Sequence, residues 1–289
     1  MSESFKPQVL SESKPKSFLE FRKSSAKEIN DEICEKFMSG SEINQEVLER
    51  IFGNDPETIK RVTYVLERFA KPKDADKARR KDGSHIATHS LQLFRTAKDF
   101  YNITNKDVGR AVLVHDLIED TQTTREDIRT ALSIEDSDLA HLMTEEELDE
   151  ESRLKAGEDK GELSIAKFAH KLKSGGEPIV LAEILDRIDD ISDLGYITQK
   201  FSKPENREKA LATLEKKFAK CSFTVDALID ENSSEEVIKM KKAFYELMGE
   251  QKQKIEAEFG VVTKEESIEK FKSKFMAFYE EIAKSQENK

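Results

Sequence analysis

The sequence predicts an all-α protein. Only 11 Gly and 6 Pro occur in 289 residues, while charged residues make up 37% of the chain. Leu, Ile, Ala, Glu and Lys are abundant, and the sustained apolar/polar alternation of half-buried strands does not appear. A chain of this length can bury a substantial core in one or two domains. No glycine-rich phosphate loop occurs, which argues against Walker-type and dinucleotide-binding proteins.

Residues 1–43 are predicted to form a mobile tail with a short helix. Residues 1 to about 24 are rich in Ser, Lys, Glu and Pro, with isolated apolar residues that cannot repay the entropy of ordering. Beyond them Ile29, Ile33 and Phe37 recur every four residues. That spacing predicts a helix from about 25 to 37, which ends at the Gly40 turn.

Residues 44–203 are predicted to form the main domain, a helical bundle. Apolar residues recur at helical spacing over about 44–52, 56–70, 84–100, 106–120, 164–173 and 177–198. Pro72 breaks the second of these patterns, and a basic cluster at 77–81 lies in the loop that follows. The acidic stretch 145–161 predicts a charged helix end followed by a surface loop.

Residues 204–289 are predicted to form a C-terminal helical extension. Long amphipathic patterns cover about 204–230, 234–258 and 264–285, without a cluster of residues suited to catalysis. The extension either packs on the main domain or offers a surface for a protein partner or for self-association.

Charge and composition narrow the class of protein. With 48 Lys+Arg against 59 Asp+Glu the net charge is −11, which disfavours general nucleic-acid binding and anionic membranes. No apolar run approaches a membrane span, and the first residues, Met1 to Ser4, do not show a basic n-region with an apolar h-region. We therefore expect a cytoplasmic protein. Cys34 and Cys221 are expected to be buried or bystander thiols, and not a disulfide or a metal pair.

The most informative segment is residues 115–121, which read His-Asp-Leu-Ile-Glu-Asp-Thr. On a helix, His115, Asp116, Glu119 and Asp120 would share one side, with like charges three and four residues apart. Such charges repel, and partial burial increases the cost unless a cation or protons compensate. The alternative is a solvated acidic face, but the flanking apolar residues leave little room for one.

Two further segments complete an ordered pattern of His, then His-Asp, then Asp. The first runs from Arg80 to His89 and the second from Ile184 to Asp190. The pattern resembles the HD-domain metal-dependent phosphohydrolases, most of all the alarmone hydrolase domain of the RelA/SpoT family and the small alarmone hydrolases. That family's middle motif, His-Asp-apolar-apolar-Glu-Asp-Thr, is matched throughout residues 115–121. The resemblance covers about residues 44 to 200.

The resemblance implies a metal site and its chemistry. His89, His115, Asp116 and Asp186 would be the ligands, and manganese is the family's usual ion. Imidazole and carboxylate ligands with open water positions suit Mn²⁺, with zinc or another divalent ion as the alternative. Glu119 and Asp120 would orient the attacking water and carry its proton. The implied substrate is a guanosine polyphosphate, from which the 3′-pyrophosphate would be removed.

Each assignment competes with a simpler interpretation. Periodicity alone places Asp186 on a solvated helix face, and a lone His89 beside an apolar face is usually a core residue. The resemblance favours ligand roles for both. A zinc pair of His85 with His89 is a weaker alternative, because no family position supports it.

The substrate contacts are implied at Arg80, Lys81 and Asp190. Arg80 matches a family position near the substrate, with Lys81 beside it in the basic cluster. However, the family has Pro, Asn and Arg where this chain has Ser90, Asp190 and Ser192. An HD hydrolase of another nucleotide or phosphoester therefore stays open as an alternative. So does a non-catalytic helical interaction protein built on an HD core.

Overall fold

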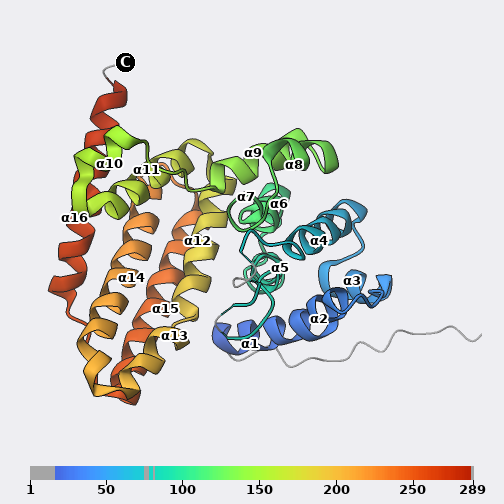
Figure 1. The fold of residues 1–289 in the computed structure, drawn as a ribbon, viewed down its shortest axis with the longest axis horizontal. Coiled ribbons are helices and arrows are strands. Elements are labelled where there is room, and N and C mark those ends of the chain that lie inside the picture. The colour runs from blue at the N-terminus through green and yellow to red at the C-terminus, as the bar shows by residue number, and fades with distance from the viewer. Residues whose placement is uncertain (1–16, 75–77, 81, 288–289) are drawn as a thin grey trace, which may run out of the picture.

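The computed structural model describes residues 17–74, 78–80 and 82–287, and its elements are all helical (Figure 1). Across these residues the extended backbone pairs only at two isolated bridges, Pro72 with Thr121 and Arg79 with His85. The predicted all-α fold is confirmed.

The first half of the fold contains seven α-helices of seven residues or more, together with shorter helical turns. Its elements are α1 (Phe18–Ile29), η1 (Asn30–Cys34), α2 (Glu35–Met38), α3 (Gln45–Phe52), α4 (Pro56–Phe69), α5 (Thr88–Arg95), η3 (Thr96–Phe100), α6 (Lys106–Val114), α7 (Leu117–Asp120), α8 (Arg125–Ala131) and α9 (Ile134–Met143). Both η1 and η3 are π-helical turns that continue an α-helix.

The second half contains the longer helices. Its elements are α10 (Glu150–Ala156), η4 (Gly157–Asp159), α11 (Lys160–Ser174), α12 (Glu177–Ser192), α13 (Gly195–Thr198), η5 (Gln199–Ser202), η6 (Pro204–Asn206), α14 (Arg207–Leu228), α15 (Glu235–Phe259) and α16 (Glu265–Glu287). The acidic stretch 145–161 is expected to be a helix end followed by a surface loop, but α9 ends at Met143 and α10 lies within the stretch, so that expectation is wrong.

The first helix begins earlier than the sequence predicts. Residues 1–16 lie outside the described part of the chain, but α1 begins at Phe18 and not near residue 25. Ser17 and Glu20 form a capping box, in which the side chain of each residue hydrogen-bonds the backbone N–H of the other. Phe21 and Ile29 anchor the helix in the interior. Because this segment has a low apolar content, the sequence did not predict its ordered amphipathic helix.

Two hydrophobic cores meet along α6. One core joins α3, α4, α7 and the N-terminal helical turns, and the other joins α11, α12 and the C-terminal helices. Helix α6 serves both, since Val108, Ala111 and Val112 face the second core while Leu113 and Val114 face the first. Figure 1 shows the result as two helical halves with α12 beside the junction.

The C-terminal helices share a hydrophobic core with the main domain. Phe218, Phe223, Phe244 and Phe275 are fully buried in the same core as α12. Cys34 and Cys221 are buried free thiols, as predicted. Within the described residues, every helix is too short or too polar to cross a bilayer.

Candidate metal centre

The His115-Asp116 pair occupies a break between two helices. The sequence predicts one helix through residues 106–120, but α6 ends at Val114 and α7 begins at Leu117. The backbone N–H of Asp120 still donates to the carbonyl of Asp116 at 2.9 Å, so a helical turn follows the break. His115 and Asp116 are therefore presented at the end of α6, at the junction of the two cores.

Four side chains from three segments converge there. His89 lies in the first turn of α5, and its Nε2 is 3.3 Å from Nε2 of His115. Asp186 of α12 places Oδ1 2.9 Å from Nε2 of His89 and 3.9 Å from Nε2 of His115. Asp116 places Oδ2 3.0 Å from Nε2 of His115 and 3.7 Å from that of His89. The structure thus brings together all four residues expected to be ligands.

The remaining ring nitrogens are held by the protein. Nδ1 of His115 donates to the carbonyl of Val112 at 3.0 Å, and Nδ1 of His89 is 2.9 Å from Oδ2 of Asp189. A hydrogen bond at Nδ1 orients an imidazole ring and leaves Nε2 available to an ion, as is usual for metal-binding histidines. His89, His115 and Asp186 offer ligand atoms within 4.8 Å of one another. The donor set fits a divalent ion.

Asp189 is a site residue that the sequence reasoning missed. Its carboxylate is buried and accepts hydrogen bonds from Arg22 of α1 and Arg80, as well as facing His89. The sequence did contain a signal for Asp189 as a site residue, because Asp189 lies three residues after Asp186 and so shares its helix face. Arg22 gave no comparable signal, since it lies in the segment predicted to be mobile.

The charges of the centre require compensation. Burial lowers the pKa of His89, but hydrogen bonds with Asp186 and Asp189 outweigh it and raise the pKa to about 10. Burial also lowers the pKa of His115, and the neighbouring Asp116 outweighs that effect, so the net shift is upward. The carboxylates therefore favour positive charge at this point, which protons or a cation can supply.

The residues expected to handle the proton lie beside the centre. Glu119 is exposed overall, yet partial desolvation of its carboxylate and the negative charge of Asp116 raise its pKa to about 7. Its carboxylate accepts a hydrogen bond from the backbone of Glu145. Asp120 is half-buried at the end of α7, where its carbonyl accepts from the backbone N–H of Lys73 at 2.9 Å.

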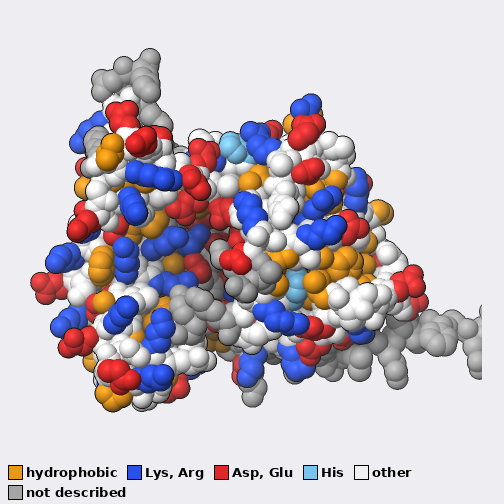
Figure 2. Space-filling model, in the orientation of Figure 1, with side chains coloured by type: hydrophobic (Ala, Val, Ile, Leu, Met, Phe, Trp, Pro, Cys, Tyr) orange, Lys and Arg blue, Asp and Glu red, His pale blue; other side chains and the backbone are white. Residues whose placement is uncertain are grey.

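The residues expected to contact substrate are already paired within the protein. Arg80 Nη2 lies 3.2 Å from both Asp189 and Asp193. Asp190 accepts from Arg187 at 2.6 Å and from Lys217 of α14 at 2.7 Å. Arg187 also lies 2.8 Å from Asp186, so this ion-pair network reaches the centre. Lys81 lies outside the described residues. In Figure 2, acidic and basic side chains gather in the hollow between the two halves.

His85 does not share a helical turn with His89. It precedes α5, and its Nδ1 accepts a hydrogen bond from the backbone N–H of Ala87 at 3.2 Å. The alternative of an i,i+4 zinc pair therefore loses its geometric basis.

No protein-family model matches the chain, and no curated protein sequence matches it.

Proposed function

We propose that the protein is a metal-dependent phosphohydrolase of the HD type. The observation that carries the proposal is the convergence of His89, His115, Asp116 and Asp186, with both histidine Nδ1 atoms already engaged. When bound, a divalent ion such as Mn²⁺ would supply acidity to water and offset the negative charge of a phosphoryl group.

We propose a guanosine polyphosphate as the substrate, on the resemblance of residues 115–121 to the alarmone hydrolases. Water would add to the 3′-phosphorus, and the bond between that phosphorus and the ribose 3′-oxygen would break. The products would be GDP or GTP and pyrophosphate. Glu119, with its pKa near 7, would accept the proton of the water, and Asp120 would hold that water in place.

The test is metal content measured together with hydrolysis. Purified protein dialysed against Mn²⁺ is expected to retain about one ion and to release pyrophosphate from guanosine tetraphosphate. His115→Gln should lose the ion and the activity with native helix content. His141→Gln is the matched control, because His141 is a more exposed histidine outside the cluster. Full activity of metal-free His115→Gln protein would contradict the proposal.

A second substrate class is favoured by the ion pairs of Arg80 and Asp190. Both groups are engaged inside the protein, which leaves them less free to bind a guanine nucleotide. The competing function is hydrolysis of another nucleotide or phosphoester at the same centre. A panel of nucleotides assayed with Mn²⁺ separates the two, because cleavage of another nucleotide with the alarmone left intact keeps the metal chemistry and rejects the alarmone.

A further inference from the structure

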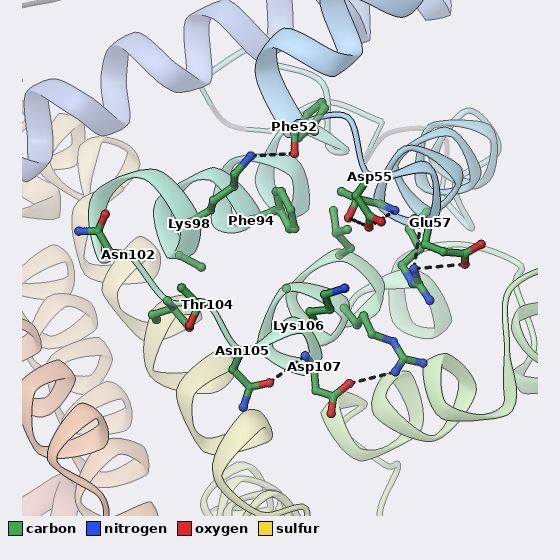
Figure 3. Close-up of a pocket in the computed structure, with 18 of the residues that line it drawn as sticks. Phe52, Asp55, Glu57, Phe94, Lys98, Asn102, Thr104, Asn105, Lys106 and Asp107 are labelled. Atoms are coloured by element: carbon green, nitrogen blue, oxygen red, sulfur yellow. Dashed lines mark hydrogen bonds and ion pairs between the residues drawn. The ribbon is translucent and has the colours of Figure 1, made fainter.

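A cavity of about 700 Å³ lies away from the metal centre, between the α3–α4 turn, η3 and the start of α6 (Figure 3). This volume falls within the range of small-molecule sites, which are usually concave, largely apolar and equipped with a few polar groups. None of the chemistry proposed above uses it.

The inner wall of the cavity is aromatic and apolar. The rings of Phe52 and Phe94 have centroids 6.0 Å apart, and buried Ala97, Ile103 and Leu113 complete the wall. Gly109 of α6 lets the Phe94 ring lie against the helix, because a Cβ there would come within 3.0 Å of Phe94 Cε2. A flat apolar or aromatic group fits such a wall.

The backbone around the cavity departs repeatedly from regular geometry. The π-helical turn η3 forms one side, and such turns are often found at functional sites. Asn102 has φ +58°, the one positive value for a non-glycine residue in the described part of the chain. Gly53 has φ +93°, and a Cβ there would lie 2.9 Å from Lys98 Nζ. These features shape the mouth of the cavity, where glycine at position 53 tolerates the positive φ.

The cavity is lined by slightly more cationic than acidic side chains: Arg61, Lys98, Lys106 and Arg110 against Asp55, Glu57 and Asp107. Asp107 is paired with Arg110 at 2.9 Å and Glu57 with Arg61 at 3.6 Å, while Asp55 caps α4 through the backbone N–H of Thr58 at 3.0 Å. The rim also carries two lysines, and the positive charge of Lys106 acts on Asp55. Lys98 donates to the carbonyl of Phe52 at 2.9 Å, and Lys106 lies at the start of α6. In Figure 3 both side chains lie around the open centre of the cavity.

The helices that line the cavity also carry the metal centre. Helix α5 has His89 in its first turn and Phe94 in its last turn, at the cavity wall. Helix α6 contributes Gly109 and Leu113 to the cavity and leads directly to His115. A ligand that orders these two helices would therefore act on both histidines.

We propose that this cavity is a regulatory site for a small aromatic anion, whose ring packs on Phe52 and Phe94 and whose charge is bound by Lys98 and Lys106. Binding at the site is independent of the proposed hydrolase function. The role of regulating the metal centre, in contrast, rests on the proposed hydrolase function.

The test uses 8-anilinonaphthalene-1-sulfonate as an aromatic anion and N-phenyl-1-naphthylamine as its counterpart without the sulfonate. Wild type is expected to bind the sulfonate saturably at one site. Lys106→Ala should weaken that binding about tenfold, as expected for loss of one charge-assisted contact, and leave binding of the uncharged probe within about twofold. Thr104→Phe, which fills the cavity from its exposed rim, should abolish binding of both probes.

Lys60→Ala is the matched control, because Lys60 is an exposed lysine of α4 that does not line the cavity. Sulfonate binding unchanged by both Lys106→Ala and Thr104→Phe would overturn the site. The regulatory role is read from the histidine ring NMR signals, which need no metal and no activity. The sulfonate should shift the His89 and His115 signals in wild type but not in Thr104→Phe protein. Signals that stay unmoved when the probe is bound would overturn the regulatory role.

Discussion

Asp189 joins three separate segments to the candidate metal centre. It accepts from Arg22 of α1 and from Arg80, and it faces Nδ1 of His89 of α5. Carboxylates in this position orient a metal-binding imidazole, and their loss commonly weakens metal affinity by about 10- to 100-fold. In this interpretation Arg80 is a positioning residue, since it holds Asp189 in place.

We predict that Asp189→Asn weakens Mn²⁺ binding by about 10- to 100-fold, because Arg22 and Arg80 lose their charged partner and His89 its fixed orientation. Affinity is measured by competition with a chelator. Asp193→Asn is the matched control, as Asp193 pairs with Arg80 but does not contact His89. An Asp189→Asn protein that binds Mn²⁺ as well as the control would show that Asp189 does not position the site.

Asp136 is a second buried carboxylate, and its role is structural. It is fully buried and accepts hydrogen bonds from Arg61 and Arg110. Burial raises the pKa of Asp136, but the two arginines and Ser133 outweigh burial and leave the pKa below its ordinary value of 3.8. Since the folded-state pKa is lowered, the ionised group stabilises the fold above pH 3.8, and this contribution is lost as pH falls through the folded-state pKa.

We predict that Asp136→Asn lowers the free energy of unfolding at pH 7 by about 3 kcal/mol, because it leaves two arginines without their buried partner. Urea unfolding at pH 7 and at pH 3 measures the change, and the gap to wild type should narrow at the lower pH. Asp138→Asn, at an exposed ion pair with Arg125, should change the free energy by less than about 1 kcal/mol. Equal effects of the two substitutions would contradict the prediction.

At the scale of helices, the sequence predicted the existence of elements better than their ends. The long C-terminal helices were placed to within a few residues, because their apolar period extends over 22 to 25 residues in α14, α15 and α16. The break at His115-Asp116 was not predicted, since periodicity continues through it. It arises where the chain passes the junction of two cores, which no local pattern records.

The candidate site likewise has features that the sequence predicted and features that depend on three-dimensional packing. The resemblance selected His89, His115, Asp116 and Asp186, whose side chains lie together in the structure, although periodicity alone would have left Asp186 in solvent. Its side chain is 14% exposed, because α12 is covered on several sides. The partners of Arg80 and Asp190 could not be predicted, since they depend on how α12 and α14 are placed in three dimensions.

Helix α1 offers a test at this scale, because its start is fixed by one local motif. We predict that Ser17→Ala costs about 1 kcal/mol of local stability, since it removes the side-chain half of the capping box. Amide hydrogen exchange should then speed up in the first turns of α1 and much less in α4. Ser24→Ala is the control, an exposed serine of the same helix whose hydroxyl donates only to the carbonyl of Phe21. Equal exchange in both variants would show that the cap does not hold α1.

For the molecule as a whole, the boundary near residue 203 separates sequence patterns but not hydrophobic cores. Helices α14 and α16 pack on α11, and α15 packs on α12. The Phe223 and Phe275 rings stack with centroids 5.2 Å apart inside that core. Lys217 of α14 also supplies a partner for Asp190 of α12. The C-terminal helices therefore complete the half of the molecule that carries Asp186.

We predict that a chain ending at residue 203 does not fold cooperatively, because α11 and α12 would expose the apolar faces that α14, α15 and α16 now cover. Circular dichroism during heating and size-exclusion chromatography measure this, and aggregation or loss of a sharp transition is expected. In the full chain, Phe275→Ala should cost about 3 to 5 kcal/mol, since it opens a cavity at a fully buried ring, whereas Val262→Ala at an exposed site should cost little. A monomeric 1–203 chain that melts sharply and retains Mn²⁺ would instead show that the C-terminal helices are a separable extension, free to serve a partner.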